Sequence, residues 1–162
     1  MSNNNDLNIL EGINNFENYQ NKFPKLVNKS IKILILPSDD EEHAFYNGTL
    51  EVYDYLKNNI QGDIVEILVE DKNYKELSLH SNAHWIGVFL VTSILAPLFT
   101  DVLSSYIVEE INAKPHDEVD LTINVVRKDK TSVSFSYRGE TENLHTLFDE
   151  VKKLSEPDEL HK

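Results

Sequence analysis

Apolar residues occur along the chain with two different spacings, and each spacing predicts a kind of element. Residues 31–36, IKILIL, and 64–69, IVEILV, are nearly continuous apolar runs rich in Ile and Val, which is typical of strands buried on both faces. Between them the apolar positions recur at helical spacing, at Leu50, Tyr53, Leu56 and Ile60. A strand, a helix and a strand over this length predict a βαβ unit with two parallel strands.

The start of the expected helix carries its own signal. Pro37 ends the first strand, and Ser38 with Glu41 forms an S-x-x-E capping box, in which both side chains satisfy free amide groups at a helix start. We therefore expect a helix directly after Pro37, interrupted at Asn47-Gly48 and resumed afterwards.

The longest uncharged segment is WIGVFLVTSILAPLF, residues 85–99. We expect a helix that is apolar on all sides, which must be covered by protein or lipid. Either this helix kinks at Pro97 or a second helix begins there. From Val102 onward the pattern is amphipathic, with Leu103, Ile107 and Ile111 on one side.

The two ends of the chain follow different periods. Apolar residues at 119–125 and 133–137 alternate with polar ones around the turn 128–130, which predicts an antiparallel hairpin with one solvated face. A helical stripe follows at Leu144, Leu147, Phe148, Val151 and Leu154, and a weaker one at Leu7, Leu10, Ile13 and Phe16 predicts a short helix before Pro24.

Together these elements predict a single α/β domain with a mixed four-stranded sheet. Its parts are a βαβ unit, an apolar helix pair, a hairpin and a C-terminal helix. The expected boundaries are an N-terminal tail with a short helix at 1–29, the domain at 30–155 and a C-terminal tail at 156–162.

Charge and composition exclude several classes of activity. The chain has 162 residues and a formal net charge of −13, so its mean field repels nucleic acid. It contains no cysteine, which excludes disulfides, thiolate zinc sites and cysteine nucleophiles. We expect no cofactor. The first residues, MSNNNDLN, lack a secretory signal, so we expect a cytoplasmic protein, and the Asn, Lys and Ile usage is typical of bacteria with AT-rich genomes.

A metal site is one candidate chemistry. His80 and His84 have the spacing of the two histidines in the zinc-protease motif H-E-x-x-H, but Ser81 stands at the position of the catalytic Glu. A third ligand would come from His43 or from the carboxylates of 39–42, which follow the carboxyl end of the first strand. These acidic residues equally fit a solvated helix start.

The segment IKILILPSDDEEHAFYNGTLEVYDYLKNN, within residues 31–60, resembles the opening of TIR and SEFIR domains, which begin with a strand, an acidic loop and a helix. The resemblance covers that part alone. Those folds continue with further parallel strands, and no residue here matches the Glu of their NAD-cleaving members, so the resemblance implies no activity. The C-terminal part resembles small uncharacterised bacterial proteins.

Three functional hypotheses follow. The first is a non-enzymatic protein–protein interaction module, a small accessory or regulatory subunit of a bacterial defence or toxin system, which binds a protein partner or a second copy. Its expected interface is the apolar helix pair, at Trp85, Phe89, Leu95, Phe99, Leu103 and Tyr106. The second is a peripheral or single-pass membrane component that uses 85–99, although fifteen residues fall short of the about 18 of a span. The third is a metal-dependent hydrolase that uses His43, His80 and His84.

Overall fold

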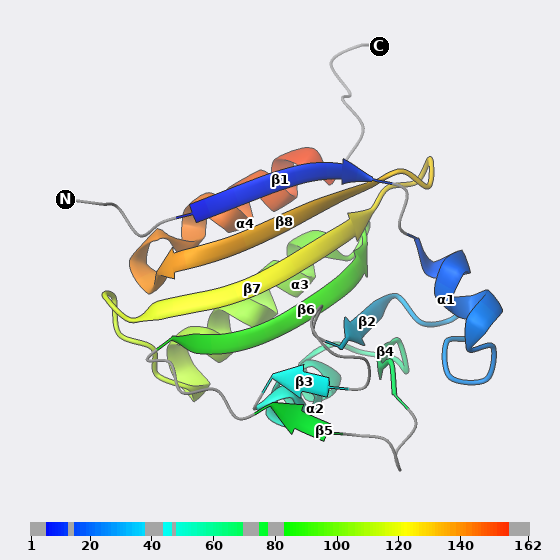
Figure 1. Cartoon of the computed structure of the whole chain (residues 1–162), viewed down its shortest axis with the longest axis horizontal. Helices are drawn as coiled ribbons and strands as arrows, with labels where there is room; N and C mark the ends of the chain where they lie inside the picture. Colours follow the sequence, from blue (N-terminus) through cyan, green and yellow to red (C-terminus); the bar gives the residue numbers. More distant parts are fainter. Residues whose placement is uncertain are drawn as a thin grey trace.

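The computed structural model describes residues 6–12, 15–37, 44–46, 48–69, 75–77 and 83–155. Its centre is one mixed sheet of six strands, in the spatial order β1-β8-β7-β6-β2-β4 (Figure 1). The bounds of these strands are Asp6–Gly12 for β1, Ser132–Glu140 for β8, Glu118–Val126 for β7, His84–Thr92 for β6, Ile33–Leu36 for β2 and Val65–Ile67 for β4. Two short parallel strands, β3 (Ala44–Tyr46) and β5 (Lys75–Leu77), form a separate pair.

Helices cover one face of the sheet. They are α2 (Thr49–Asn59), α3 (Ala96–Ser105) and α4 (Leu144–Leu154), together with a π-helical turn η2 (Tyr106–Glu110) and a 3₁₀ turn η3 (Thr141–Asn143). The main core lies between this layer and the sheet, where Phe89 and Phe99 meet edge to face with ring centroids 5.1 Å apart.

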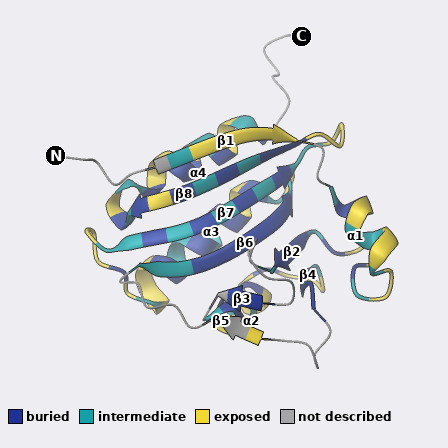
Figure 2. Ribbon diagram, viewed as in Figure 1, coloured by how far each residue is buried: buried dark blue, intermediate teal, exposed yellow. Residues whose placement is uncertain are grey.

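The opposite face is covered over part of its width. Helix α1 (Phe16–Lys22) and the chain after it bury a second cluster against β2 and β6, with Phe16, Leu34 and Leu90 among its members. In β2 the odd residues Ile33 and Ile35 face the main core and the even residues face this second cluster. Most residues of β7 and β8 on this face are only half-buried (Figure 2).

The fold class expected from the sequence is confirmed at its coarser level: the chain is a mixed α/β structure with a single main sheet. Strands β2 and β4 are parallel and joined through α2, as the βαβ pattern predicts. The hairpin is present as β7 and β8, and the helical stripe from Leu144 is α4. The main sheet has six strands where the sequence predicted four.

The helix expected at 85–99 is wrong. Residues 84–92 form strand β6 in the middle of the sheet, and Pro97 lies in the first turn of α3, which begins at Ala96. The run is apolar without alternation because β6 is covered on both faces, by the main core at Phe89 and by the second cluster at Leu90. Of the two alternatives at Pro97, a second helix starting there is correct.

A β-bulge near the start of β6 changes which side chains face which layer. Trp85 pairs with Asp120 of β7, but Gly87 pairs with the next residue, Leu121, so Ile86 is the extra residue. Leu121 faces the main core, whereas Asp120 lies on the opposite face of β7. The bulge therefore places Trp85 on the face away from the helices.

Other expected elements also differ. The short helix expected from Leu7 is strand β1, followed by the separate helix α1. The helix expected directly after Pro37 is replaced in its described part by strand β3, and α2 begins only after Gly48. The capping box of Ser38 and Glu41 lies outside the described residues.

Candidate interaction surfaces

Strand β1 forms one outer edge of the main sheet. It pairs antiparallel with β8 over seven residue pairs, from Asp6 with Arg138 to Gly12 with Ser132. Among the described residues no strand pairs with its other side, so β1 is an edge strand of the main sheet. We call this outer side, residues 6–12, the β1 edge.

The β1 edge presents an apolar side chain on each face of the sheet. Leu10 is 69% exposed and pairs with Ser134 on the polar face, whereas Ile9 is 36% exposed and pairs with Phe135, a member of the main core. The strand contains neither Lys nor Pro, the residues that commonly protect an exposed edge.

One arginine fixes the end of β1 against the body of the fold. Arg127 donates through Nη1 to Glu11 Oε1 at 2.9 Å and through Nη2 to Glu11 Oε2 at 3.4 Å, and its Nε donates to the carbonyl oxygen of Leu154 at 2.9 Å. Its side chain is only 16% exposed. The edge is therefore held in an extended conformation before any partner arrives.

The sheet face beside the β1 edge is polar. The hydroxyl oxygens of Thr122 and Ser136 lie 3.3 Å apart across β7 and β8, and the guanidinium of Arg138 lies 5.4 Å from the centre of the Trp85 ring. Burial raises the pKa of Asp120, which lies between Trp85 and Arg138 in the strand register, although the nearby Arg138 charge lowers it.

A second candidate surface is a cleft between α2 and η2, with a volume of about 360 Å³. We call it the acidic cleft; its lining residues are Glu51, Asp54, Tyr55, Asn58, Tyr106, Glu110 and Ile111. Three of these residues are carboxylates and none is basic. Tyr55 and Tyr106 meet at a tilt of 59° with centroids 5.3 Å apart.

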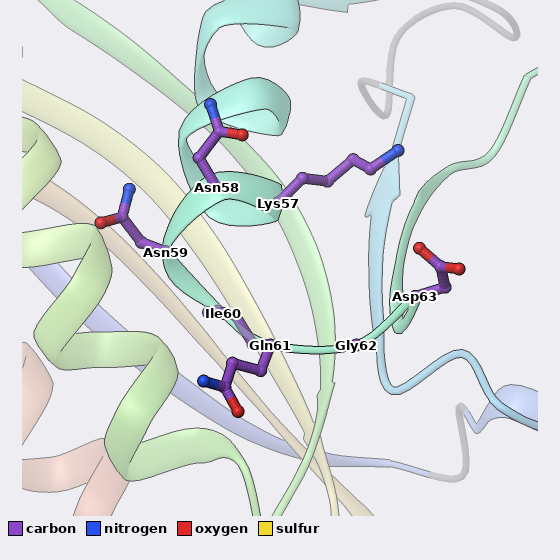
Figure 3. Close-up of a pocket in the computed structure, with 7 residues that line it drawn as sticks. All are labelled: Lys57, Asn58, Asn59, Ile60, Gln61, Gly62 and Asp63. Carbon is purple, nitrogen blue, oxygen red and sulfur yellow. The ribbon is translucent and has the colours of Figure 1, made fainter.

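A second hollow lies near the C-terminal end of α2, and its lining comes from one short segment of the chain. It is lined by the consecutive residues 57–63, and the side chains of Asn58, Asn59 and Gln61 point in different directions (Figure 3). A ligand site requires polar groups that converge from several directions. This hollow is formed by a single bend of the chain, and its lining residues do not converge in that way.

One corner of the molecule gathers groups that can ligate a metal. His116 Nδ1 lies 3.2 Å from Glu140 Oε2 and 3.8 Å from Glu142 Oε1. Within the described part of the chain these are the three residues whose ligand atoms all approach within 4.8 Å. A His nitrogen with two carboxylates suits a divalent transition metal, but His116 is 79% exposed and the same contacts are those of a surface ion pair.

Of the predicted metal ligands, the structure describes His84 alone, and His84 is not part of this group. His84 Nε2 contacts Asp117 Oδ2 at 3.1 Å, and that carboxylate also accepts from the backbone amide of Lys114 at 2.9 Å. The backbone bond and the contact with His84 lower the pKa of Asp117. His43, His80 and the carboxylates of 39–42 lie outside the described residues.

The residues predicted for a protein interface are mostly buried by the chain itself. Phe89, Phe99 and Leu103 are fully buried and Tyr106 is 6% exposed, whereas Trp85 and Leu95 are half-buried. That prediction assumed an apolar helix too large for its own sheet, and the assumption is wrong because half of the segment is a central strand.

The membrane hypothesis relied on the same segment. Among the described residues, no helix combines the length and the apolar character needed to cross a bilayer.

Sequence reasoning missed both the β1 edge and the acidic cleft. The sequence pattern predicts Leu10 in a helical stripe, although Leu7 and Ile9 are separated by the polar Asn8, a spacing that is compatible with a strand. The cleft depends on which residues of α2 and η2 face each other, and no local pattern contains that information. Comparison with family models, with curated proteins and with solved structures finds no match for this chain.

Proposed function

We propose that this chain is a non-enzymatic protein-binding module that takes up an extended segment of a partner protein along the β1 edge. Strand addition joins a peptide to a free sheet edge through backbone hydrogen bonds, while its alternating side chains meet the two faces of the sheet. The seven-residue length of β1 suits such a segment. The observation that carries the proposal is the position of β1 at the outer edge of the described sheet, with Leu10 69% exposed.

The occupant is a different protein and not a second copy of this chain. Pairing two β1 edges would bring together two molecules that each carry a formal net charge of −13. Such self-repulsion opposes association of identical chains and favours a neutral or basic partner.

Photo-crosslinking tests this proposal. A photoreactive residue replaces Asn8, an exposed position on the β1 edge, in cells that produce the protein, and the adduct is mapped by mass spectrometry. The same residue at Ile94 is the control, because Ile94 is 69% exposed, as Leu10 is, but lies in the turn between β6 and α3. We expect one recurrent extended segment to couple at position 8 and not at position 94.

The mapped segment, made as a peptide, is then added to the purified chain. Binding along β1 slows amide hydrogen exchange in residues 6–12, and Leu10→Lys abolishes this protection whereas Ile94→Lys does not. Equal crosslinking at both positions, or a peptide that leaves the exchange of β1 unchanged, would refute strand addition.

A further inference from the structure

The acidic cleft and the β1 edge are separate surfaces. Helix α2 packs against β4, which is the outermost strand on the side of the sheet opposite β1. What the cleft binds is therefore independent of whether strand addition occurs at β1.

The charge of the cleft is uncompensated by its own lining. Glu51, Asp54 and Glu110 supply three carboxylates from two elements, and no lining residue is basic. Their ligand atoms do not gather within 4.8 Å as those around His116 do. Carboxylates that are spread along a cleft suit an extended cation better than a single metal ion.

A tyrosine adds a second observation. Tyr106 is 6% exposed as a whole residue, lines the cleft, and makes no hydrogen bond through its hydroxyl with any residue in the described ranges. Burial raises its pKa to about 12, and the charges of Glu51 and Glu110 act in the same direction. The hydroxyl therefore stays protonated at neutral pH, near both carboxylates, and its oxygen can accept a hydrogen bond from a group that enters the cleft.

The π-helical turn explains why these groups share one side. Ile111 N donates to Tyr106 O at 3.1 Å, which is the i to i+5 bond of a π turn. Glu110, four residues after Tyr106, would share its side in any helix, and the wider turn brings Ile111 onto that side as well, where all three line the cleft with α2. Such turns inside helices occur often at functional sites.

We propose that the acidic cleft binds an arginine side chain of a partner protein. A guanidinium stacks on aromatic rings, forks between carboxylate oxygens and is more weakly hydrated than an ammonium, so it matches two tyrosines set among three carboxylates. Leu50, which is 42% exposed and lies one turn before Asp54 on α2, offers an adjacent apolar contact for the residues around that arginine.

The test titrates the purified full chain with acetyl-Gly-Arg-Gly-amide, with acetyl-Gly-Lys-Gly-amide and with spermidine at constant ionic strength, and follows residue-resolved NMR shifts. We expect saturable shifts confined to residues 51–58 and 106–111, with the arginine peptide bound about two- to fivefold more tightly than the lysine peptide.

Variants separate a specific site from general attraction to an acidic protein. Glu51→Gln and Asp54→Asn should each weaken binding of the arginine peptide about two- to fivefold, and Tyr106→Phe about two- to tenfold. Glu109→Gln removes the same charge one residue from Glu110 but outside the cleft lining, so it should leave binding unchanged.

Three results would overturn the proposal: shifts spread over the whole acidic surface, equal weakening by Glu109→Gln, or binding of spermidine in preference to the arginine peptide. The unfolding midpoint of each variant is measured in parallel. Because Tyr106→Phe keeps the ring and Glu51→Gln changes an exposed side chain, we expect both to fold normally.

Discussion

Gly87 lies directly after the extra residue of the bulge, and its replacement by alanine probes how rigidly the core holds β6. Its φ of +147° belongs to a region that side-chain-bearing residues rarely adopt. A Cβ added there would lie 3.0 Å from Cζ and 3.3 Å from Cε2 of Phe89. Phe89 is fully buried and packs edge-on against Phe99, so its ring has little room to move.

The expected cost has two parts. Holding a non-glycine residue at this φ costs about 1–3 kcal/mol, and forcing an extra methyl into a packed core costs about 1–3 kcal/mol. We therefore expect Gly87→Ala to lower the free energy of unfolding by about 2–6 kcal/mol. Against a typical total of about 5–15 kcal/mol, this change is large.

Urea unfolding followed by circular dichroism measures this cost, and Gly62→Ala is the matched control. Gly62 also has a positive φ, +92°, but a Cβ there meets Ile64 Cγ2 at an ordinary 3.5 Å. The loss of stability in Gly62→Ala should therefore reflect the cost of the backbone conformation alone. The reasoning is refuted if the two substitutions cost the same, since the Phe89 ring would then yield freely.

A double-mutant cycle with Phe89→Leu isolates the contact between the new methyl and the ring. A positive φ alone would give no coupling between the two sites. We expect the second substitution to recover part of the loss at Gly87, with a coupling of about 0.5–3 kcal/mol.

Three further predictions concern the sheet and its helices. Asp120→Asn should raise the free energy of unfolding at neutral pH. Burial raises the pKa of Asp120 in the folded state, so its stabilising contribution is fully present below the pKa of the unfolded chain and is lost as the pH rises through the folded pKa. Urea unfolding midpoints across pH 3–8 should therefore show the advantage of the Asn variant vanish in acid. Arg127→Lys should cost about 1–2 kcal/mol, because a lysine cannot bond both Glu11 and the Leu154 carbonyl in the same geometry, and exchange of β1 amides should rise. Leu147→Ala, at a fully buried site in α4, should cost about 2–5 kcal/mol in thermal or urea unfolding.

The elements that the sequence predicted correctly carry their information locally. The alternation in β7 and β8 and the stripe of α4 each record one buried face, so spacing alone identifies them. Pro37 and Gly62 mark real ends of elements in the same way.

The errors occurred where tertiary contacts decide the structure. Residues 85–92 have no alternation because both faces of β6 are covered, and the bulge at Ile86 breaks the period that remains. A buried helix and a doubly covered strand then have the same pattern. Likewise, the seven residues of β1 become a strand only because β8 lies beside them, more than a hundred positions later in the chain.

The candidate surfaces were still harder to predict. Tyr106 was expected at an interface as part of an apolar face, yet the structure places it in a cleft among three carboxylates that the sequence pattern does not single out. The excess of acidic residues is visible in the sequence, but which of them lie beside Tyr55 and Tyr106 depends on the tertiary structure.

The position of β1 at the edge of the described sheet also has a consequence for handling the protein. With an isoelectric point near 4.8, mild acidification removes the net charge of the molecule while Leu10 stays exposed. Copies that avoid one another at neutral pH then lose their colloidal protection, and edge-to-edge stacking becomes the easiest route to precipitation.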